Sequence, residues 1–260
     1  MSLRSLRRFA PLLALFLACA CSALPDSVQA DSPPPLWRVA SDLDNPPFAF
    51  VDEAGVPQGR DVDMTRELAR ALDVSLVWDR MPFDELLDAL EAGEVDAVVA
   101  TLGATPERAE RVLLSTPYYL TSLRVLVRRG DGEPQDLRAL AGKRVAAGVG
   151  TTSEAALRER LPEAVEAEPS AKGASSLERL LTGEVDALVM DGPDALDFAR
   201  ERPGEVVVLP EALAEERYVI AVRPGAEAWL ARLDAELDAL LGRGWLDELD
   251  RRFGLPPSAR

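Results

Sequence analysis

Histidine is absent from this chain of 260 residues, and its two cysteines, Cys19 and Cys21, both lie near the N-terminus. Beyond Cys21 the chain therefore has no thiol nucleophile, no disulfide, and neither thiolate nor imidazole to bind a metal. These absences exclude the common zinc sites and the catalytic triads that depend on histidine. We expect neither a metal nor another cofactor in the folded part of the chain.

Positive charge is also scarce. The chain has 29 Lys and Arg residues against 45 Asp and Glu residues, which gives a formal net charge of -16 at pH 7. A surface this acidic repels the phosphates of nucleic acids and the head groups of anionic lipids. We therefore expect no nucleic-acid partner, and we interpret the excess charge as a solvated, solubilising surface.

The N-terminus has the pattern of an export signal, because arginines precede an apolar run over residues 9–20 and polar residues follow it. The run is too short to span a bilayer as a permanent helix, so we exclude residues 1–30 from the fold. Val28-Gln29-Ala30 fits a cleavage site, whereas Cys19 and Cys21 stand where a lipoprotein cysteine would. Both interpretations, a cleaved signal peptide and a lipid anchor, stay open.

From residue 36 onward, short valine-rich runs alternate with amphipathic stretches, which is typical of strands and helices in an α/β fold. The first series predicts strands at 36–40, 75–78 and 95–100, with helices at 61–72 and 83–92. The second series predicts strands at 144–147, 165–167 and 185–190, with helices at 154–160 and 175–181. The same order of elements occurs twice.

One pentapeptide, Gly-Glu-Val-Asp-Ala, occurs in both series, at residues 93–97 and 183–187. Each copy follows a leucine-rich helix and precedes a strand, and glycine suits the C-terminal cap of such a helix. A generic helix-to-strand turn explains either copy alone. Two copies in matching places predict two lobes of similar construction.

The chain is expected to cross between these lobes twice, because residues 120–129 and 218–222 are both apolar and strand-like. An acidic loop at 211–216 precedes the second crossing. The predicted organisation is a signal segment at 1–30, a proline-rich linker at 31–35, lobe 1 at 36–120 and 218–260 with terminal helices at 229–253, and lobe 2 at 121–217. We therefore predict two α/β lobes joined by a two-strand hinge.

Ligands of open α/β sheets bind where strands end and helices begin, and the two pentapeptide strands end in different chemistry. After the first, Thr105 can cap a short helix from which Arg108 projects a guanidinium that could bind a carboxylate. The alternative is a solvated arginine paired with Glu107 or Glu110. After the second, Asp191 could accept from an ammonium group, cap the next helix, or do both.

A third candidate element is the turn from strand to helix at residues 148–154, whose Thr151 and Glu154 match the capping-box spacing. Free backbone N–H groups at such a helix start can bind a carboxylate or a phosphate. The segment has too few glycines for a nucleotide-binding phosphate loop. Arg108, this helix start and Asp191 together offer partners for both charges of an α-amino acid.

The chain resembles the bacterial extracellular solute-binding proteins of family 3, the polar amino-acid binders of ABC transporters. The family pattern runs through residues 42–48, 59–63, 105–108, 115–119, 150–152, 244–245 and 253–254. The resemblance implies the two-lobed, type II periplasmic-binding-protein fold, an amino acid as ligand, and an ABC transporter permease in the inner membrane as partner. It also implies a monomeric, non-enzymatic protein outside the cytoplasm.

The same resemblance implies roles for nine residues. The ligand carboxylate would be bound by Arg108, Thr151 and Thr152. The ligand ammonium group would be bound by Asp191 and by the backbone near Thr101 and Gly103. The ligand side chain would be bound by Asp42, Asn45 and Phe83, and for Phe83 an ordinary place in the core is the alternative.

Four positions depart from the family pattern: Asn45, Arg60, Gly103 and Gly148. Two of them, Asn45 and Gly103, fall in the implied site, so the side-chain pocket is the least determined part of it. With Asp42 as its only candidate charge, a polar neutral or cationic amino acid is favoured over an acidic one.

Two alternatives remain to be tested. The same fold family includes periplasmic cyclohexadienyl dehydratases, but such catalysis needs a general acid in the cleft, and no carboxylate stands out for that role. A sensor that signals ligand binding to a separate membrane protein would use the same lobes and contacts.

Overall fold

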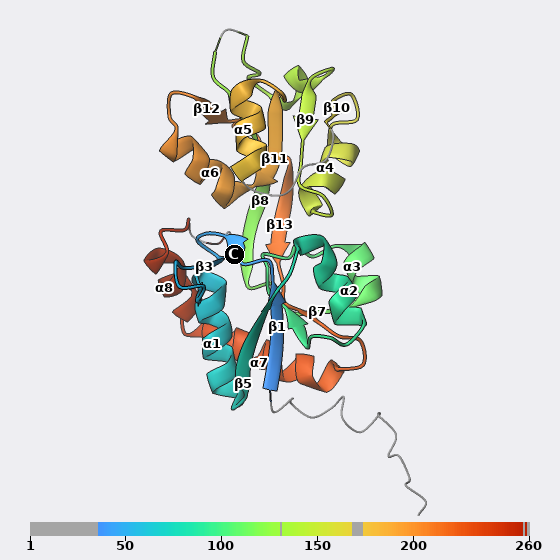
Figure 1. Ribbon diagram of the computed structural model, residues 1–260, viewed down its shortest axis with the longest axis vertical. Helices are drawn as coiled ribbons and strands as arrows, with labels where there is room; N and C mark the ends of the chain where they lie inside the picture. The colour runs from blue at the N-terminus through green and yellow to red at the C-terminus, as the bar shows by residue number, and fades with distance from the viewer. Residues whose placement is uncertain (1–35, 131, 168–173, 257, 259–260) are drawn as a thin grey trace, which may run out of the picture.

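A computed structural model describes residues 36–130, 132–167, 174–256 and 258. The predicted signal segment 1–30 and linker 31–35 lie outside the described residues. The chain forms two α/β lobes, as predicted, and Figure 1 shows β8 and β13 running between them. In the described ranges, every helix is too short or too polar to cross a bilayer.

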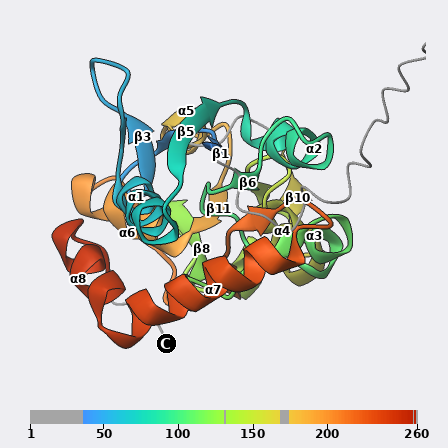
Figure 2. The same ribbon diagram turned by 90° about the horizontal axis from the view of Figure 1, so that it is seen from below.

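Lobe 1 is built on a five-stranded sheet of order β5-β1-β6-β14-β7, in which β1 is parallel to β5 and to β6. Its elements before the first crossing are β1 (Leu36–Ser41), β2 (Asp44–Asn45), β3 (Ala49–Val51), β4 (Pro57–Gln58), α1 (Arg60–Leu72), β5 (Ser75–Arg80), a 3-10 helix (Phe83–Glu85), α2 (Leu86–Glu91), β6 (Ala97–Val98), α3 (Pro106–Arg111) and β7 (Leu113–Leu114). After the second crossing come β14 (Ala221–Val222), α7 (Glu227–Gly242) and α8 (Trp245–Arg252). Figure 2 shows α7 and α8 along one side of this lobe.

Lobe 2 is built on a sheet of order β10-β9-β11-β8-β12, with β13 also paired to β8. Its elements are β8 (Tyr119–Arg128), a 3-10 helix (Leu137–Leu140), β9 (Arg144–Ala146), α4 (Thr152–Arg160), β10 (Val165–Glu166), α5 (Ala174–Thr182), β11 (Ala187–Asp191), α6 (Gly192–Glu201), β12 (Val206–Val208) and β13 (Ala214–Tyr218). Each lobe has its own apolar core on both faces of its sheet, so each can keep its shape while the hinge moves.

The repeated pentapeptide makes the same contacts in both lobes. In lobe 1, Asp96 accepts from the backbone N–H and the Nε of Arg38, whose Nη2 donates to the Gly93 carbonyl. In lobe 2, Asp186 accepts from the backbone N–H and the Nε of Arg144, whose Nη2 donates to the carbonyl of the matching glycine. The sequence repeat is thus a structural repeat, in which each aspartate joins its turn to the neighbouring parallel strand.

The second crossing differs from the prediction. The single strand expected at 218–222 is two strands, β13 and β14, and the loop expected at 211–216 overlaps β13. Along β13, Glu216 and Tyr218 are buried whereas Glu215 and Arg217 are exposed. This alternation is the period of a half-buried strand, and pairing with β8 overrides the low strand propensity of the acidic residues.

Arg60 lies in a buried network that ties α1 to α8 and to the base of the hinge. Its side chain is fully buried, and it forms ion pairs with Asp250 at 2.9 Å and with Asp61 at 3.2 Å. The guanidinium carbon lies 5.1 Å from the ring centroid of Tyr118 and 5.5 Å from that of Tyr119. An arginine can stand here because two carboxylates and two aromatic rings replace its hydration.

Candidate ligand-binding site

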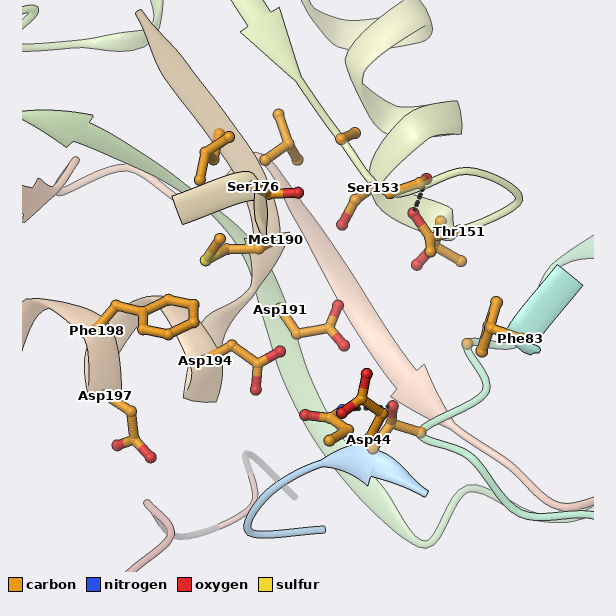
Figure 3. Close-up of a pocket in the computed structure, with 18 of the residues that line it drawn as sticks. Asp44, Phe83, Thr151, Ser153, Ser176, Met190, Asp191, Asp194, Asp197 and Phe198 are labelled. Carbon is orange, nitrogen blue, oxygen red and sulfur yellow. Dashed lines mark hydrogen bonds between the residues drawn. The ribbon is translucent and has the colours of Figure 1, made fainter. Parts of the chain in front are cut away.

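A cavity of about 440 Å³ lies between the lobes, and residues of both lobes line it. This volume is within the range of pockets that enclose small-molecule ligands. In Figure 3, Asp191 and Asp194 lie on one side of the cavity, and Phe83 and Thr151 lie on the other. Eight of the nine residues predicted for the site line it: Asn45, Phe83, Thr101, Gly103, Arg108, Thr151, Thr152 and Asp191.

Arg108 reaches the cavity from α3, where Thr105 caps the helix by accepting from the backbone N–H of Arg108 at 3.1 Å. The Arg108 side chain lies over the ring of Phe83, 5.7 Å from its centroid. Nη1 donates to the carbonyl of Gly103 at 2.6 Å, and Nη2 donates to the carbonyl of Gly150 in the other lobe at 2.9 Å. Arg108 therefore connects the two lobes at the cavity, and it is not a solvated arginine paired with its helix neighbours.

The charged side chain of Arg108 is largely buried from solvent. Burial lowers the pKa of its guanidinium, and the carboxylates of Glu216, Asp191 and Glu107 act in the opposite direction. An arginine stays protonated under such conditions because its usual pKa is so high. A guanidinium has five N–H donors, so two bonds to carbonyls leave donors that can bind an anion in the cavity.

Asn45 and Thr101 form a fixed pair on the lobe 1 side. Both are buried, and Nδ2 of Asn45 donates to Oγ1 of Thr101 at 3.0 Å. Thr101 follows β6 with a φ of 48°, which a β-branched residue seldom adopts. Strain of this kind persists only where the surroundings hold it, and it concentrates at binding sites.

Lobe 2 presents the N-terminus of α4 to the cavity. Oγ1 of Thr151 accepts from the backbone N–H of Glu154 at 3.3 Å, and the Glu154 carboxylate accepts from the N–H of Gly150 at 2.8 Å. The Thr151 bond is the one that the capping-box spacing predicts, whereas the Glu154 carboxylate bonds to the N–H of the residue before the cap and not to that of Thr151. Thr152 and Ser153 begin the helix, where backbone N–H groups have no helical carbonyl to bond, so this end of α4 favours an anion.

Asp191 ends β11 and occupies the N-cap position of α6, but its side chain forms no capping hydrogen bond. Its Oδ2 instead accepts from the Tyr218 hydroxyl at 2.8 Å. Burial, together with the charge of Asp191, raises the pKa of Tyr218 well above its usual value, so the hydroxyl remains a donor. Tyr218 thus orients a carboxylate that lines the cavity along with Arg108.

Asp42 is the one predicted residue that does not line the cavity among those described. Its carbonyl accepts from Nε of Arg80 at 3.1 Å, outside the lining. Leu43, with a φ of 48°, turns the chain between Asp42 and Asp44, and Asp44 lines the cavity instead. On this side of the site the lining carboxylate is that of Asp44, and not that of Asp42 as the resemblance implied.

The sequence of residues 37–256 matches the family model of the bacterial extracellular solute-binding proteins, family 3. The chain belongs to this family. Among curated relatives, the L-cystine-binding protein TcyJ of Escherichia coli is 27% identical over 80% of this chain and 78% of its own length.

Solved structures of amino-acid-binding proteins have the same two-lobed fold. An ancestral arginine-binding protein, determined with arginine and with glutamine bound, has 30% identity and a TM-score of 0.78, with 85% of this chain covered. The matched region covers 99% of the glutamine-bound protein and 98% of the arginine-bound protein. An ancestral amino acid-binding protein described as a precursor of cyclohexadienyl dehydratase has 30% identity and a TM-score of 0.76, covering 84% of this chain and 94% of its own.

Most of the acidic residues that line the cavity were not predicted from the sequence. Among the described residues of the lining, the charged ones besides Arg108 are all carboxylates: Asp44, Asp191, Asp194, Asp197 and Glu201. Four of them share one side of α6 and its N-cap at spacings of three and four residues, which is a helical signal that the sequence does contain. Asp197 is also paired with Arg200 at 2.7 Å, so its charge is partly offset.

Proposed function

We propose that this protein captures an amino acid between its lobes outside the cytoplasm and delivers it to the permease of an ABC transporter. The proposal depends most on one observation: Arg108, the N-terminus of α4 and Asp191 all line the same interlobe cavity. In Figure 3, Thr151 at that helix N-terminus and Asp191 lie on different sides of it. Family membership and the amino-acid-binding relatives support it.

In this proposal the ligand carboxylate binds the guanidinium of Arg108 and the first N–H groups of α4, near Thr151 and Thr152. The ligand ammonium binds the carboxylate of Asp191 and backbone oxygens near Thr101. A charge-assisted hydrogen bond in a closed, water-poor cavity is stronger than the same bond at the surface. Closure of the lobes and capture of the ligand therefore stabilise each other.

We infer that the preferred ligands carry a further positive charge. In the described part of the lining, five carboxylates stand against one guanidinium, so an acidic side chain would meet repulsion and a cationic one attraction. The ancestral relative named for arginine binding has been determined with arginine bound, as this choice predicts, and also with the neutral amino acid glutamine.

The direct test is calorimetric titration of the wild-type protein with a panel of amino acids, followed by Arg108→Ala and Asp191→Ala. Truncating one partner of a buried charge pair costs about 2–5 kcal/mol, so each variant should lose about thirtyfold or more in affinity. Arg111→Ala is the matched control, since Arg111 lies on the same helix and pairs at the surface with Asp88. A folded wild-type protein that binds no amino acid contradicts the proposal.

We also propose that the protein is a binder rather than an enzyme, and that it acts as a monomer. The first point is supported by its curated relatives, which are named as binding proteins. Incubation with prephenate or arogenate should give no aromatic product, and the appearance of one would favour the dehydratase alternative. Light scattering during gel filtration should give the mass of one chain.

Export through residues 1–30 is proposed on the family's extracellular location. The mass of the mature N-terminus distinguishes cleavage after Ala30 from lipid attachment at Cys19 or Cys21. Sensitivity of processing to globomycin would indicate the lipoprotein route.

A further inference from the structure

Glu216 is a buried carboxylate in the hinge that contacts Thr152, one of the residues assigned to the ligand carboxylate. It stands in β13 opposite Thr121 of β8 and is 4% exposed. Its neighbours Glu215 and Arg217 point outward and pair with each other at 3.3 Å. Glu216 is not among the described residues that line the cavity. It therefore acts on the site through lining residues that lie next to it, Thr152 and Gly103.

The space for Glu216 exists because residue 103 is glycine. A Cβ atom on Gly103 would lie 1.8 Å from Oε1 of Glu216 and 2.6 Å from Cγ2 of Thr152. The backbones are fixed to each other here, since Gly103 bridges to Tyr218 and the N–H of Ala104 donates to the Arg217 carbonyl at 2.8 Å. A carboxylate from the hinge thus takes the place that a side chain at residue 103 would occupy.

Glu216 determines how the hydroxyl of Thr152 can bond. Oγ1 of Thr152 donates to Oε1 of Glu216 at 3.0 Å. A hydroxyl has one proton, and an ionised carboxylate can only accept, so this proton is committed to Glu216. Toward the cavity, Thr152 can then offer only lone pairs, which suit an N–H donor and repel a carboxylate oxygen.

Glu216 also places a negative charge near Arg108, because Nη1 of Arg108 donates to the carbonyl of Gly103 at 2.6 Å and Oε1 of Glu216 occupies the space beside the same glycine. The carboxylate of Glu216, like those of Asp191 and Glu107, opposes the lowering of the Arg108 pKa by burial. A buried guanidinium without a partner is costly, but here the partner is present whatever the ligand carries.

We propose that Glu216 is a specificity-determining residue, which makes the site favour the cationic groups of its ligand and reduces its dependence on the ligand carboxylate. The inference rests on the proposed function, since it assumes that the ligand carboxylate faces Arg108. The ligand class it predicts is organic cations, including amines that lack the α-carboxylate.

The wild-type protein gives the first test, through calorimetric titration with L-arginine and agmatine, its decarboxylated counterpart, and with L-histidine and histamine. Losing one partner of a buried charge pair usually costs about thirtyfold or more in affinity. Because Glu216 stays beside Arg108, we expect less than about thirtyfold between the members of the tighter-binding pair. A difference of about a thousandfold or more would overturn the inference.

Glu216→Gln gives the second test, because it removes the charge and keeps the shape of the side chain. Arg108 then depends on the ligand carboxylate, so the preference for the amino acid over its amine should rise by about tenfold. Glu215→Gln makes the same chemical change on the outward side of the same strand and should leave the preference unchanged. Equal effects of the two variants, or an unchanged preference in Glu216→Gln, would overturn the inference.

Thermal unfolding without ligand checks that the variants fold, and Glu216→Ala is the second variant if the amide is not tolerated. It also removes the charge, so it should shift the preference in the same direction. A folded wild-type protein that binds no amino acid of the panel removes the proposed function and this inference with it. An unchanged preference in a protein that binds amino acids removes the inference alone.

Discussion

Asp250→Asn changes one of the two carboxylates that surround the buried guanidinium of Arg60. In the native protein Oδ1 of Asp250 lies 2.9 Å from Nε of Arg60, and both side chains are almost completely buried. The substitution keeps the volume but leaves Arg60 with only the charge of Asp61, at 3.2 Å. Breaking a buried ion pair on one side costs about 3–5 kcal/mol. Because Asn can still accept one hydrogen bond, we expect the lower end, about 3 kcal/mol.

Urea denaturation followed by circular dichroism measures this loss as a change in the free energy of unfolding. For a protein of this size, each kcal/mol shifts the melting temperature by about 2–4 °C, so Tm should fall by about 6–12 °C. Asp247→Asn is the matched control, because Asp247 lies on the exposed side of the same helix, α8. The control should stay within about 0.5 kcal/mol of wild type. A loss below about 1 kcal/mol in Asp250→Asn, or one equal to the control, would refute the reasoning.

Two further predictions concern the site and the repeat. Gly103→Ala should weaken ligand affinity by about tenfold or more in calorimetry and also lower Tm, because its Cβ would collide with the buried carboxylate of Glu216 and with Thr152; unchanged affinity would contradict this. Asp186→Asn should lower the urea midpoint at about pH 7 but much less at about pH 3. The hydrogen bond from Arg144 lowers the pKa of Asp186, so its contribution is present above the usual pKa and is lost as pH falls through the folded value; a difference independent of pH would contradict it.

The parts of the site that the sequence predicted well are those fixed by short-range chemistry. Thr105 and Thr151 were recognisable as caps because a capping residue bonds to a group three positions away. Arg108 and Asp191 could be placed at the cavity because each follows a copy of the repeated pentapeptide at the end of a strand. Asp42 was predicted from the family resemblance, and nothing local in the sequence reveals the positive φ of Leu43, after which Asp44 lines the cavity.

The two lobes, their internal repeat and the capped helices that face the cavity were determined by the sequence alone, since periodicity and capping act within a few residues. The tertiary structure decided which distant groups meet: Arg60 with Asp250 across 190 positions, and Thr152 with Glu216 across 64. Glu216 points inward and reaches Thr152 only because β13 pairs with β8 in one register, and a shift of one residue would turn it to solvent. Such contacts depend on strand pairing and on how the lobes close, and no local pattern encodes either.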